Sequence, residues 1–373
     1  MRARIFAFVA IVQSILFLAH LALYETWMFF LGPLNSSRTA ELRVTLAILS
    51  VSFVAATLLA HQSSHFVVRI FYSISSVWLG LVNFFLLAMC ACWVVYGVPG
   101  LLGLQLDRRP LAIAFFGASC LTGVYGVVNA AWTRVKKIMI GVPNLPASWQ
   151  GRTAAMVSDL HLGHVRNRRF LRRIVTTIAR LRPDIVFIPG DLFDGTAVDL
   201  NRLDQPLSKL SAPLGVYFVN GNHEEFSSPG KYNDAVRRCG IRVLVNEKVN
   251  IDGVQIVGVD YLDSTNVEHF RSVLRKIGVD RDAPSVLLVH TPDRLQTAAE
   301  EGISLQLSGH THRGQFFPFN LIVARIYREF AYGLHHFGAL AVYTSCGAGT
   351  WGPPMRVGTN PEIVLIRFEL LAG

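Results

Sequence analysis

Residues 153–163 read Thr-Ala-Ala-Met-Val-Ser-Asp-Leu-His-Leu-Gly. The apolar run Thr153–Val157 passes almost directly into an aspartate and a histidine, Asp159 and His161. Continuous apolar runs of this length are typical of strands that are covered on both faces of a sheet. The stretch therefore predicts a buried strand whose carboxyl end carries polar side chains.

The same arrangement recurs four times further along the chain. Apolar runs at 185–188, 216–219, 286–289 and 305–307 lead into Gly190-Asp191-Leu-Phe-Asp194, Gly221-Asn222-His223-Glu224, His290-Thr-Pro and Gly309-His310-Thr-His312. In open α/β layers, ligands bind outside the carboxyl ends of the strands. We therefore expect the five polar segments to meet at one rim.

Further short apolar runs predict strands at 254–259, 340–343 and 363–368. Between the first two polar segments, Phe170–Arg182 has apolar residues on one side and arginines on the other, which predicts an amphipathic helix. We interpret it as a crossover helix with a solvated basic face; contact with lipid headgroups is the alternative. Strands that alternate with helices indicate an α/β or layered α+β domain.

Charge is distributed unevenly along the 373 residues. Residues 1–133 hold seven arginines, no lysine and three acids, whereas the whole chain has 35 basic and 25 acidic residues. Hydrophobic residues make up 51% of the chain, which excludes intrinsic disorder, and five cysteines are too few for a disulfide scaffold. We therefore expect a membrane domain at 1–133, a linker at 134–150 marked by two prolines, and a second domain at 151–373.

Four apolar runs occupy the first domain: Ile5–Leu23, Val44–Ala60, Ile70–Tyr96 and Leu111–Trp132. A helix needs about 20 apolar residues to cross the hydrocarbon core. Any single run could be a buried core helix, but four in succession predict a bundle of four transmembrane helices. The basic cluster Arg134, Lys136 and Lys137 after the last run favours a cytoplasmic second domain, because cytoplasmic loops carry more lysine and arginine.

The predicted rim offers carboxylate, amide and imidazole donors and no cysteine. Such donors suit divalent Mn, Fe, Co, Ni or Zn. Asp191 could bridge two ions, and two neighbouring divalent ions favour the in-line displacement of a phosphate ester. The candidate metal ligands are Asp159, His161, Asp191, Asn222, His290, His310 and His312.

His223 remains as a spare imidazole beside these ligands. It could hydrogen-bond a phosphate oxygen or protonate a leaving group. Asp194 could orient it, since carboxylates commonly hold an imidazole in one tautomer.

Taken together, the five segments resemble the signature of the calcineurin-like metallophosphoesterases over about residues 150–370. The resemblance implies a two-sheet β-sandwich flanked by helices, with two divalent metal ions at one edge. It also implies that His223 is the catalytic imidazole and pairs with Asp194. By the same resemblance, one ion takes Asp159, His161, Asp191 and His312, and the other takes Asp191, Asn222, His290 and His310.

The segment Phe316–Phe330 is unusually apolar for one that follows a polar motif. One interpretation is a loop and helix that cover the core. The other is a wall that rests on the bilayer and accepts acyl chains while arginines hold phosphate. We expect Arg325 and Arg356 to bind substrate.

We accordingly predict a multi-pass protein of the bacterial inner membrane that cleaves a phosphoester or diphosphate bond in a phosphorylated amphiphile at the lipid bilayer. A resemblance to the membrane-linked branch leaves UDP-2,3-diacylglucosamine pyrophosphate hydrolysis as an alternative, and a non-catalytic membrane sensor or transporter is an alternative of another class. The net charge of +10 and the run Arg166-Asn-Arg-Arg prompt a nucleic-acid role, but no groove-reading motif accompanies them. We expect neither a nucleic acid nor an obligate protein partner.

Overall fold

The computed structural model describes residues 2–32, 34–104 and 106–371, and side chains from residue 6 onward within these ranges. The chain forms two compact units, which we describe separately. One comprises Met1–Val128 with Gly352–Met355, and the other comprises Asn129–Trp351 with Arg356–Gly373.

The first unit is built from long apolar helices, as the sequence predicts. They are α1 (Arg2–Leu31), α2 (Ser36–Gln62), α3 (Phe66–Leu101) and α4 (Arg108–Ala131). Each is long and apolar enough to cross a membrane. Many large apolar side chains on them are exposed, among them Phe6 at 73% and Leu121 at 73%. Such surfaces suit lipid rather than water.

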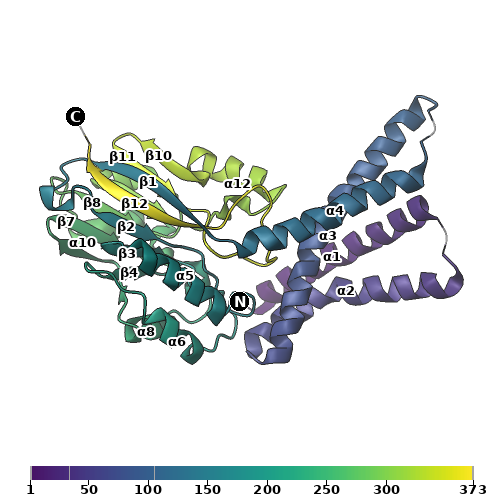
Figure 1. Cartoon of the computed structure of the whole chain (residues 1–373), viewed down its shortest axis with the longest axis horizontal. Coiled ribbons are helices and arrows are strands. Elements are labelled where there is room, and N and C mark those ends of the chain that lie inside the picture. The colour runs from purple at the N-terminus through teal and green to yellow at the C-terminus, as the bar shows by residue number, and fades with distance from the viewer. Residues whose placement is uncertain (1, 33, 105, 372–373) are drawn as a thin grey trace. The chain divides into compact units, whose positions relative to one another are not determined.

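The second unit contains two six-stranded mixed sheets (Figure 1). The first runs in the order β1-β12-β2-β3-β4-β5 and the second in the order β10-β11-β9-β8-β7-β6. Strands β2 to β5 are parallel in the first sheet, and β11, β9, β8 and β7 are parallel in the second. The first sheet comprises β1 (Arg134–Val142), β2 (Thr153–Met156), β3 (Ile185–Pro189), β4 (Val216–Val219), β5 (Arg242–Val243) and β12 (Glu362–Leu370). The second comprises β6 (Glu247–Ile251), β7 (Val254–Gly258), β8 (Ser285–Leu288), β9 (Leu305–Ser308), β10 (Gly333–Phe337) and β11 (Leu340–Thr344).

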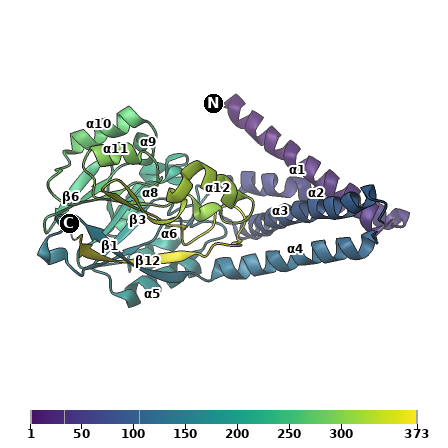
Figure 2. The ribbon, with the colours of Figure 1, turned by 90° about the horizontal axis from the view of Figure 1, so that it is seen from above.

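The sheets pack face to face, and helices cover their outer faces. A central core joins side chains of both sheets, for example Phe187 of β3 and Leu288 of β8. Helices α5 (Arg168–Leu181), α6 (Asn201–Leu207) and α8 (Pro229–Arg238) cover the first sheet, and α10 (Val267–Ile277) and α11 (Leu295–Glu300) cover the second. Figure 2 shows α10 and α11 on one side of the strands and α5 on the other. The predicted two-sheet sandwich flanked by helices is therefore confirmed.

Helix α5 shows how local sequence sets these boundaries. The side chain of Asn167 accepts hydrogen bonds from the backbone N–H groups of Arg169 and Phe170, which satisfies two donors at the helix start. Phe170 and Ile174 lie on its buried face. The helix ends where Arg182 adopts a left-handed conformation, with φ of 48°. The predicted crossover helix is thus present with its apolar face on the first sheet.

The expected linker at 134–150 differs from the structure. Residues 134–142 form β1, which pairs in parallel with β12, and Ala147–Trp149 form a 3-10 turn. The linker was predicted from the two prolines, which follow this strand, and the basic residues of β1 interrupt its apolar pattern. Basic side chains are usual on an edge strand, because they discourage pairing with other chains.

Candidate functional site

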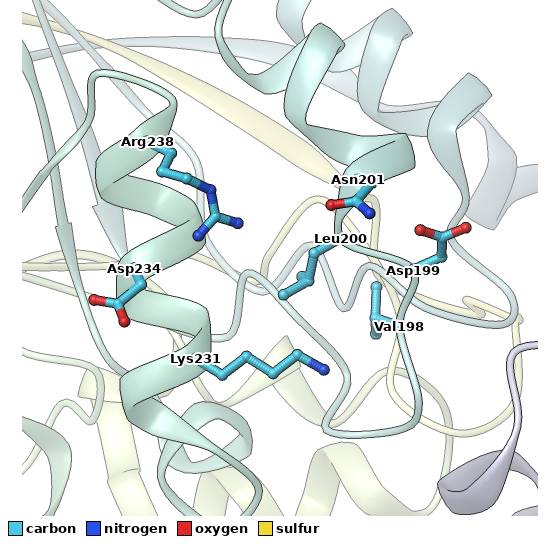
Figure 3. A pocket seen from close by; sticks show the side chains of 7 residues that line it. All are labelled: Val198, Asp199, Leu200, Asn201, Lys231, Asp234 and Arg238. Atoms are coloured by element: carbon cyan, nitrogen blue, oxygen red, sulfur yellow. The ribbon is translucent and has the colours of Figure 1, made fainter.

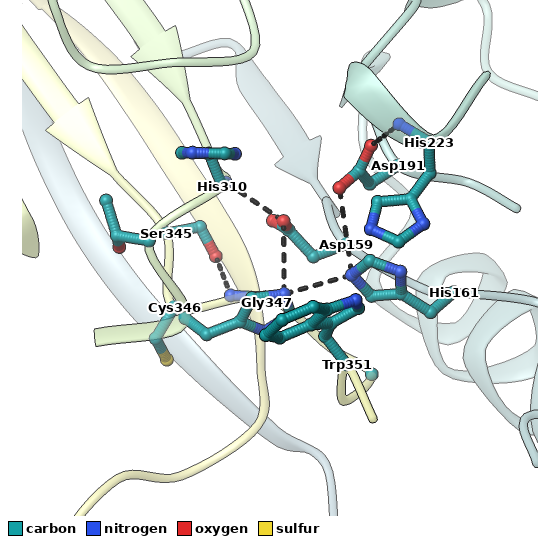
Figure 4. Close-up of polar contacts among 12 residues, drawn as sticks. Asp159, His161, Asp191, His223, His310, Ser345, Cys346, Gly347 and Trp351 are labelled. Carbon is teal, nitrogen blue, oxygen red and sulfur yellow. Dashed lines mark hydrogen bonds and ion pairs between the residues drawn. The ribbon is translucent and has the colours of Figure 1, made fainter. Parts of the chain in front are cut away.

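The predicted metal ligands converge at one rim of the sandwich, although they come from five separate segments of the chain. Figure 4 shows Asp159, His161, Asp191 and His310 among them. Each segment follows a strand: Asp159 and His161 follow β2, Asp191 follows β3, Asn222 begins α7 (Asn222–Glu225) after β4, His290 follows β8, and His310 and His312 follow β9. Parallel strands place their carboxyl ends at the same edge, which is why the segments meet.

One group of candidate ligands consists of Asp159, His161 and His312, all buried. The Nε2 atoms of the two histidines lie 2.9 Å apart. His312 Nε2 lies 3.6 Å from Asp159 Oδ1. The backbone N–H of His310 donates to the same Oδ1 at 2.9 Å and fixes the carboxylate.

A second group consists of Asp191, His290 and His310. His290 Nε2 lies 3.2 Å from Asp191 Oδ2 and 3.2 Å from His310 Nδ1. Asn222 joins this group, because its Oδ1 lies 3.1 Å from His290 Nε2 and 3.0 Å from His310 Nδ1. Asp191 Oδ2 also lies 3.8 Å from His161 Nε2, so this carboxylate faces both groups.

The ionisation of these side chains is strongly perturbed by burial and by one another. Burial raises the pKa of Asp159 to about 6 against the charge of His290. Burial also opposes ionisation of Asp191, but His290 outweighs it and holds the pKa of Asp191 well below its usual value. For His290, the charges of Asp191 and Asp159 outweigh burial and raise its pKa to about 10.

The imidazoles of His161, His310 and His312 stay neutral near pH 7. Burial and the neighbouring histidine and arginine charges hold the pKa values of His161 and His312 well below 6.5. Burial likewise lowers the pKa of His310 to about 4. Neutral imidazole is the form that coordinates metal ions.

The backbone at this rim is held in an uncommon conformation. Asp159, His161, Asp191, His310 and His312 all have positive φ, between 47° and 69°. Each such non-glycine residue costs on the order of 1 kcal/mol and persists only where surrounding contacts enforce it. The strain turns each side chain out of its strand direction and toward the common centre.

Two glycines let the ligand segments come close together. A Cβ on Gly221 would run into the carboxylate and backbone of Asp191, and one on Gly309 would meet Asp159 Oδ2. Neither glycine has a positive φ, so close approach rather than backbone conformation is the reason for glycine here.

The donor set fits divalent cations. Asp159 Oδ2 is buried without a hydrogen-bond partner among the described residues. The Nε2 atoms of His161 and His312 face each other beside Asp159, so one cation could take a lone pair from each of these residues. Such a cation would also give the buried Asp159 carboxylate a partner. The predicted ligand residues are thus present in a suitable arrangement, with Asp159, His161 and His312 around one position and Asp191, Asn222, His290 and His310 around the other.

His223 lies next to both groups of ligands, and hydrogen bonds fix both its ring and its backbone. Its Nδ1 donates to the main-chain carbonyl of Asp194 at 2.8 Å, and its backbone N–H donates to Asp191 Oδ1 at 3.0 Å. The sequence suggested that the Asp194 carboxylate would orient His223. Instead, that carboxylate accepts from the backbone and hydroxyl of Thr196, and the tautomer of His223 is set by a carbonyl.

Glu224 is a structural member of the site that sequence reasoning did not single out. Its buried carboxylate accepts from the backbone N–H groups of Asp191, Phe193 and Gly221 at 2.8–3.0 Å. It therefore ties the segment after β3 to the segment after β4. The sequence signal that could have identified Glu224 was its position directly after Asn222-His223.

The two arginines expected to bind substrate lie in different settings. Arg325 is exposed on α12 (Phe319–Tyr327). Arg356 is fully buried, and its guanidinium donates to the carbonyl oxygens of Cys346, Gly349 and His312 at 2.6–3.3 Å. Its Nη2 also lies 3.1 Å from the side-chain atom His312 Nδ1. This buried position is a correction to the expected substrate contact, because the guanidinium is already occupied by the segments that carry and support the metal ligands.

Aromatic side chains surround the metal-site imidazoles. The ring of Tyr261 lies 6.1 Å from that of His290, Tyr327 lies 6.2 Å from His310, and Trp351 lies 6.5 Å from His223. These residues lie outside the motifs, so only the folded chain reveals their position.

A surface pocket of about 630 Å³ lies elsewhere, between α6 and α8 (Figure 3). None of the predicted site residues lines it. Its lining combines two acids with two bases, and we assign it no part in the site. The lining residues are Val198, Asp199, Leu200, Asn201, Lys231, Asp234 and Arg238.

Comparisons with known proteins agree with this geometry. Residues 153–314 match the family model described as calcineurin-like phosphoesterase. A Danio rerio protein described as a transmembrane protein with metallophosphoesterase domain is 32% identical over 78% of this chain and 73% of its own length. An uncharacterized metallophosphoesterase of Aquifex aeolicus is 33% identical over 67% of this chain and 97% of its own length. One of Campylobacter jejuni is 31% identical over 66% of each chain.

Proposed function

Because this chain belongs to the calcineurin-like metallophosphoesterases, we propose that it is a membrane-anchored, two-metal phosphohydrolase that acts on a lipid-like, phosphorylated amphiphile. Hydrolysis of a phosphoric ester follows from the family; the lipid-like substrate is our proposal. The observation that carries the activity is the convergence of seven oxygen and imidazole donors on two adjoining positions.

The chain's own residues have separable roles in this proposal. Asp159, His161 and His312 would hold one divalent ion, and Asn222, His290 and His310 would hold the other, with the Asp191 carboxylate available to both. Such a pair of ions supplies a nucleophile from water at neutral pH and offsets the charge of a phosphoryl group. His223, whose Nδ1 proton is engaged by the Asp194 carbonyl, presents its other ring nitrogen to the leaving group.

Helix α12 supports the lipid-like substrate. None of its residues is buried, so it does not cover the core. Large apolar side chains on and beside it are exposed, including Phe317 at 46%, Leu321 at 58% and Ile326 at 64%. Exposed arginines at 325 and 328 accompany them. An apolar surface with basic residues is typical of segments that lie in a membrane interface.

The short connection between the last apolar helix and the sandwich supports the same proposal. Four helices long enough to cross a membrane precede the sandwich, and only two residues separate the end of α4 from the start of β1. The domain therefore stays close to any bilayer that holds α4, where amphiphilic phosphates are concentrated.

A substrate comparison tests the lipid-like assignment. We expect Phe317→Ser and Ile326→Ser to reduce turnover of a phospholipid or of UDP-2,3-diacylglucosamine far more than turnover of a soluble chromogenic phosphodiester. Val245→Ser, which alters an apolar residue that is 40% exposed on another segment, is the matched control. Equal losses on lipid and soluble substrates would contradict the role of α12. Absence of turnover for every substrate by the metal-loaded parent protein would instead favour the non-catalytic sensor.

We further propose that the catalytic domain lies on the cytoplasmic side of a bacterial inner membrane, on the basis of Arg134, Lys136 and Lys137 after the last helix. A reporter fused after Gly373 tests this side. Activity of a reporter that works only in the cytoplasm is expected, and activity of one that works only outside it would contradict the orientation.

A further inference from the structure

Trp351 is a conspicuously exposed residue at the end of the Gly347–Trp351 loop. Its side chain is 62% exposed, whereas Trp149 in the same unit is fully buried. Exposed apolar residues that occur singly are common on protein surfaces, so exposure alone implies nothing. What sets Trp351 apart is that its backbone is fixed on both sides and that its ring lies beside the catalytic imidazole proposed above.

The buried side chain of Gln315 fixes the backbone of Trp351. The Gln315 amide oxygen accepts from the Trp351 N–H at 3.0 Å, and its amide nitrogen donates to the Trp351 carbonyl at 3.1 Å. The backbone N–H of Gln315 in turn donates to the His312 carbonyl at 3.0 Å. Trp351 is therefore held in register with the segment that carries His310 and His312.

Gln315 is itself held firmly. Its carbonyl accepts from the backbone N–H of Val357 at 3.1 Å and from the hydroxyl of Thr359 at 3.1 Å. The side-chain amide of Gln315 is 6% exposed, and both of its polar atoms are paired with the Trp351 backbone. Movement of the loop would leave these buried atoms without partners, which costs free energy. The backbone that carries the indole is thus held in one position.

The ring faces the reacting side of the site. Its centroid lies 6.5 Å from that of His223, with an angle of 74° between the ring planes. His223 lies 4.7 Å from His161, also edge to face. Trp351, His223 and His161 can be seen together in Figure 4. Since His223 is the residue assigned to the leaving group, the indole beside it lies along that group's path.

We propose that Trp351 is a specificity-determining residue that stacks against a planar aromatic or heteroaromatic group on the leaving-group side of the phosphate. This assignment rests on the proposed function and names the chemistry of the departing group. An exposed indole on a fixed backbone offers a large, rigid apolar face with only two side-chain torsions left to order. A substrate with a planar group next to the phosphorus gains that contact, and one with a small alkyl group does not.

Binding of phosphonates to the full chain, purified in detergent and loaded with Mn, tests the proposal without turnover. We expect the parent protein to bind phenylphosphonate more tightly than ethylphosphonate in calorimetry. Trp351→Ala should weaken phenylphosphonate binding by about tenfold, the scale of one aromatic stacking contact, and should remove the preference. Trp351→Phe should keep most of it, because a ring remains.

A control variant and the metal content of each protein separate the stacking role of Trp351 from the phosphohydrolase proposal. Phe337→Ala, which removes an aromatic ring that is 38% exposed on β10, should leave the preference intact. Equal weakening of both ligands by Trp351→Ala at unchanged metal content would overturn the stacking role while leaving the phosphohydrolase proposal standing. Equal binding of both phosphonates by the parent protein would overturn it as well. A metal-loaded parent protein that binds neither would overturn both proposals.

Discussion

The Nε2 atoms of His161 and His312 lie 2.9 Å apart, although 151 residues separate the two histidines in the chain. Both rings are buried, and burial keeps both imidazoles neutral. Asp159 lies beside them, with its Oδ1 3.6 Å from His312 Nε2. One carboxylate and two neutral imidazoles that face one position form a donor set that suits a divalent cation.

Asp191→Asn should abolish hydrolysis while leaving membrane insertion intact. The carboxylate of Asp191 faces both groups of ligands, and an amide cannot offer two anionic oxygens. Turnover, metal content and membrane fractionation of the variant check this expectation. Undiminished turnover would refute the position of Asp191 between the two ions.

His223→Ala should reduce the rate by roughly 10²- to 10⁴-fold, the usual contribution of general acid–base catalysis, while the metal content stays the same. His223 also lies within reach of His161 and Asp191 as a possible third donor. Metal analysis of the variant decides between these roles. Loss of an ion on substitution would reassign His223 as a ligand.

Metal binding near pH 7.5 should release at least one proton per chain, because the charges of Asp191 and Asp159 outweigh burial and raise the pKa of His290 to about 10, and the ring must be neutral as a ligand. The direction follows from the raised pKa: the imidazole is charged at any pH below about 10 until a cation displaces its proton. Calorimetric titration with Mn in buffers of different ionisation enthalpy measures the release. His290→Gln should release about one proton fewer than the parent protein, and a parent protein that releases no proton would contradict the assignment.

Gly309→Ala should weaken metal binding, because the added Cβ would meet Asp159 Oδ2. Gly230→Ala is the matched control, since a Cβ there meets nothing within 4 Å. Metal affinity and the thermal unfolding temperature of both variants provide the comparison. Equal metal affinities for the two would show that the Asp159 carboxylate has room to move.

Arg356→Met should lower the unfolding temperature by several degrees. The substitution leaves the carbonyls of Cys346 and Gly349 buried without their donor, a loss of roughly 1–3 kcal/mol for each unsatisfied group. Arg325→Met, which alters an exposed guanidinium, should have little effect on stability. Similar unfolding temperatures for both variants would remove the bracing role of Arg356.

The sequence predicted the interior of the sandwich better than its margins. All eight expected strands are present, and each is buried on both faces for most of its length, which is the pattern that apolar runs report. The strands that were not predicted, β1, β5, β6 and β10, are the four sheet edges. Edge strands carry polar and charged residues such as Lys136 and His335, so their sequences look like loops.

The candidate site also contains residues that the sequence predicted and residues that it did not. Residues such as Asp159 and His310 were predictable, because each follows a buried strand within a short motif. Trp351 and the buried position of Arg356 were not, because they depend on contacts with residues distant in the chain, namely Gln315 for the Trp351 backbone and His312 for the Arg356 guanidinium. The sequence also could not show that His223 contacts the main-chain carbonyl of Asp194 and not its carboxylate, because both groups belong to the same residue.

The most direct test of the account is the metal content of the full-length protein, loaded with Mn and freed of excess metal, measured together with its turnover of a phosphate ester. We predict about two ions per chain, and we predict that chelation removes ions and turnover together and that Mn restores both. Turnover that persists in protein shown to hold no metal would contradict the account.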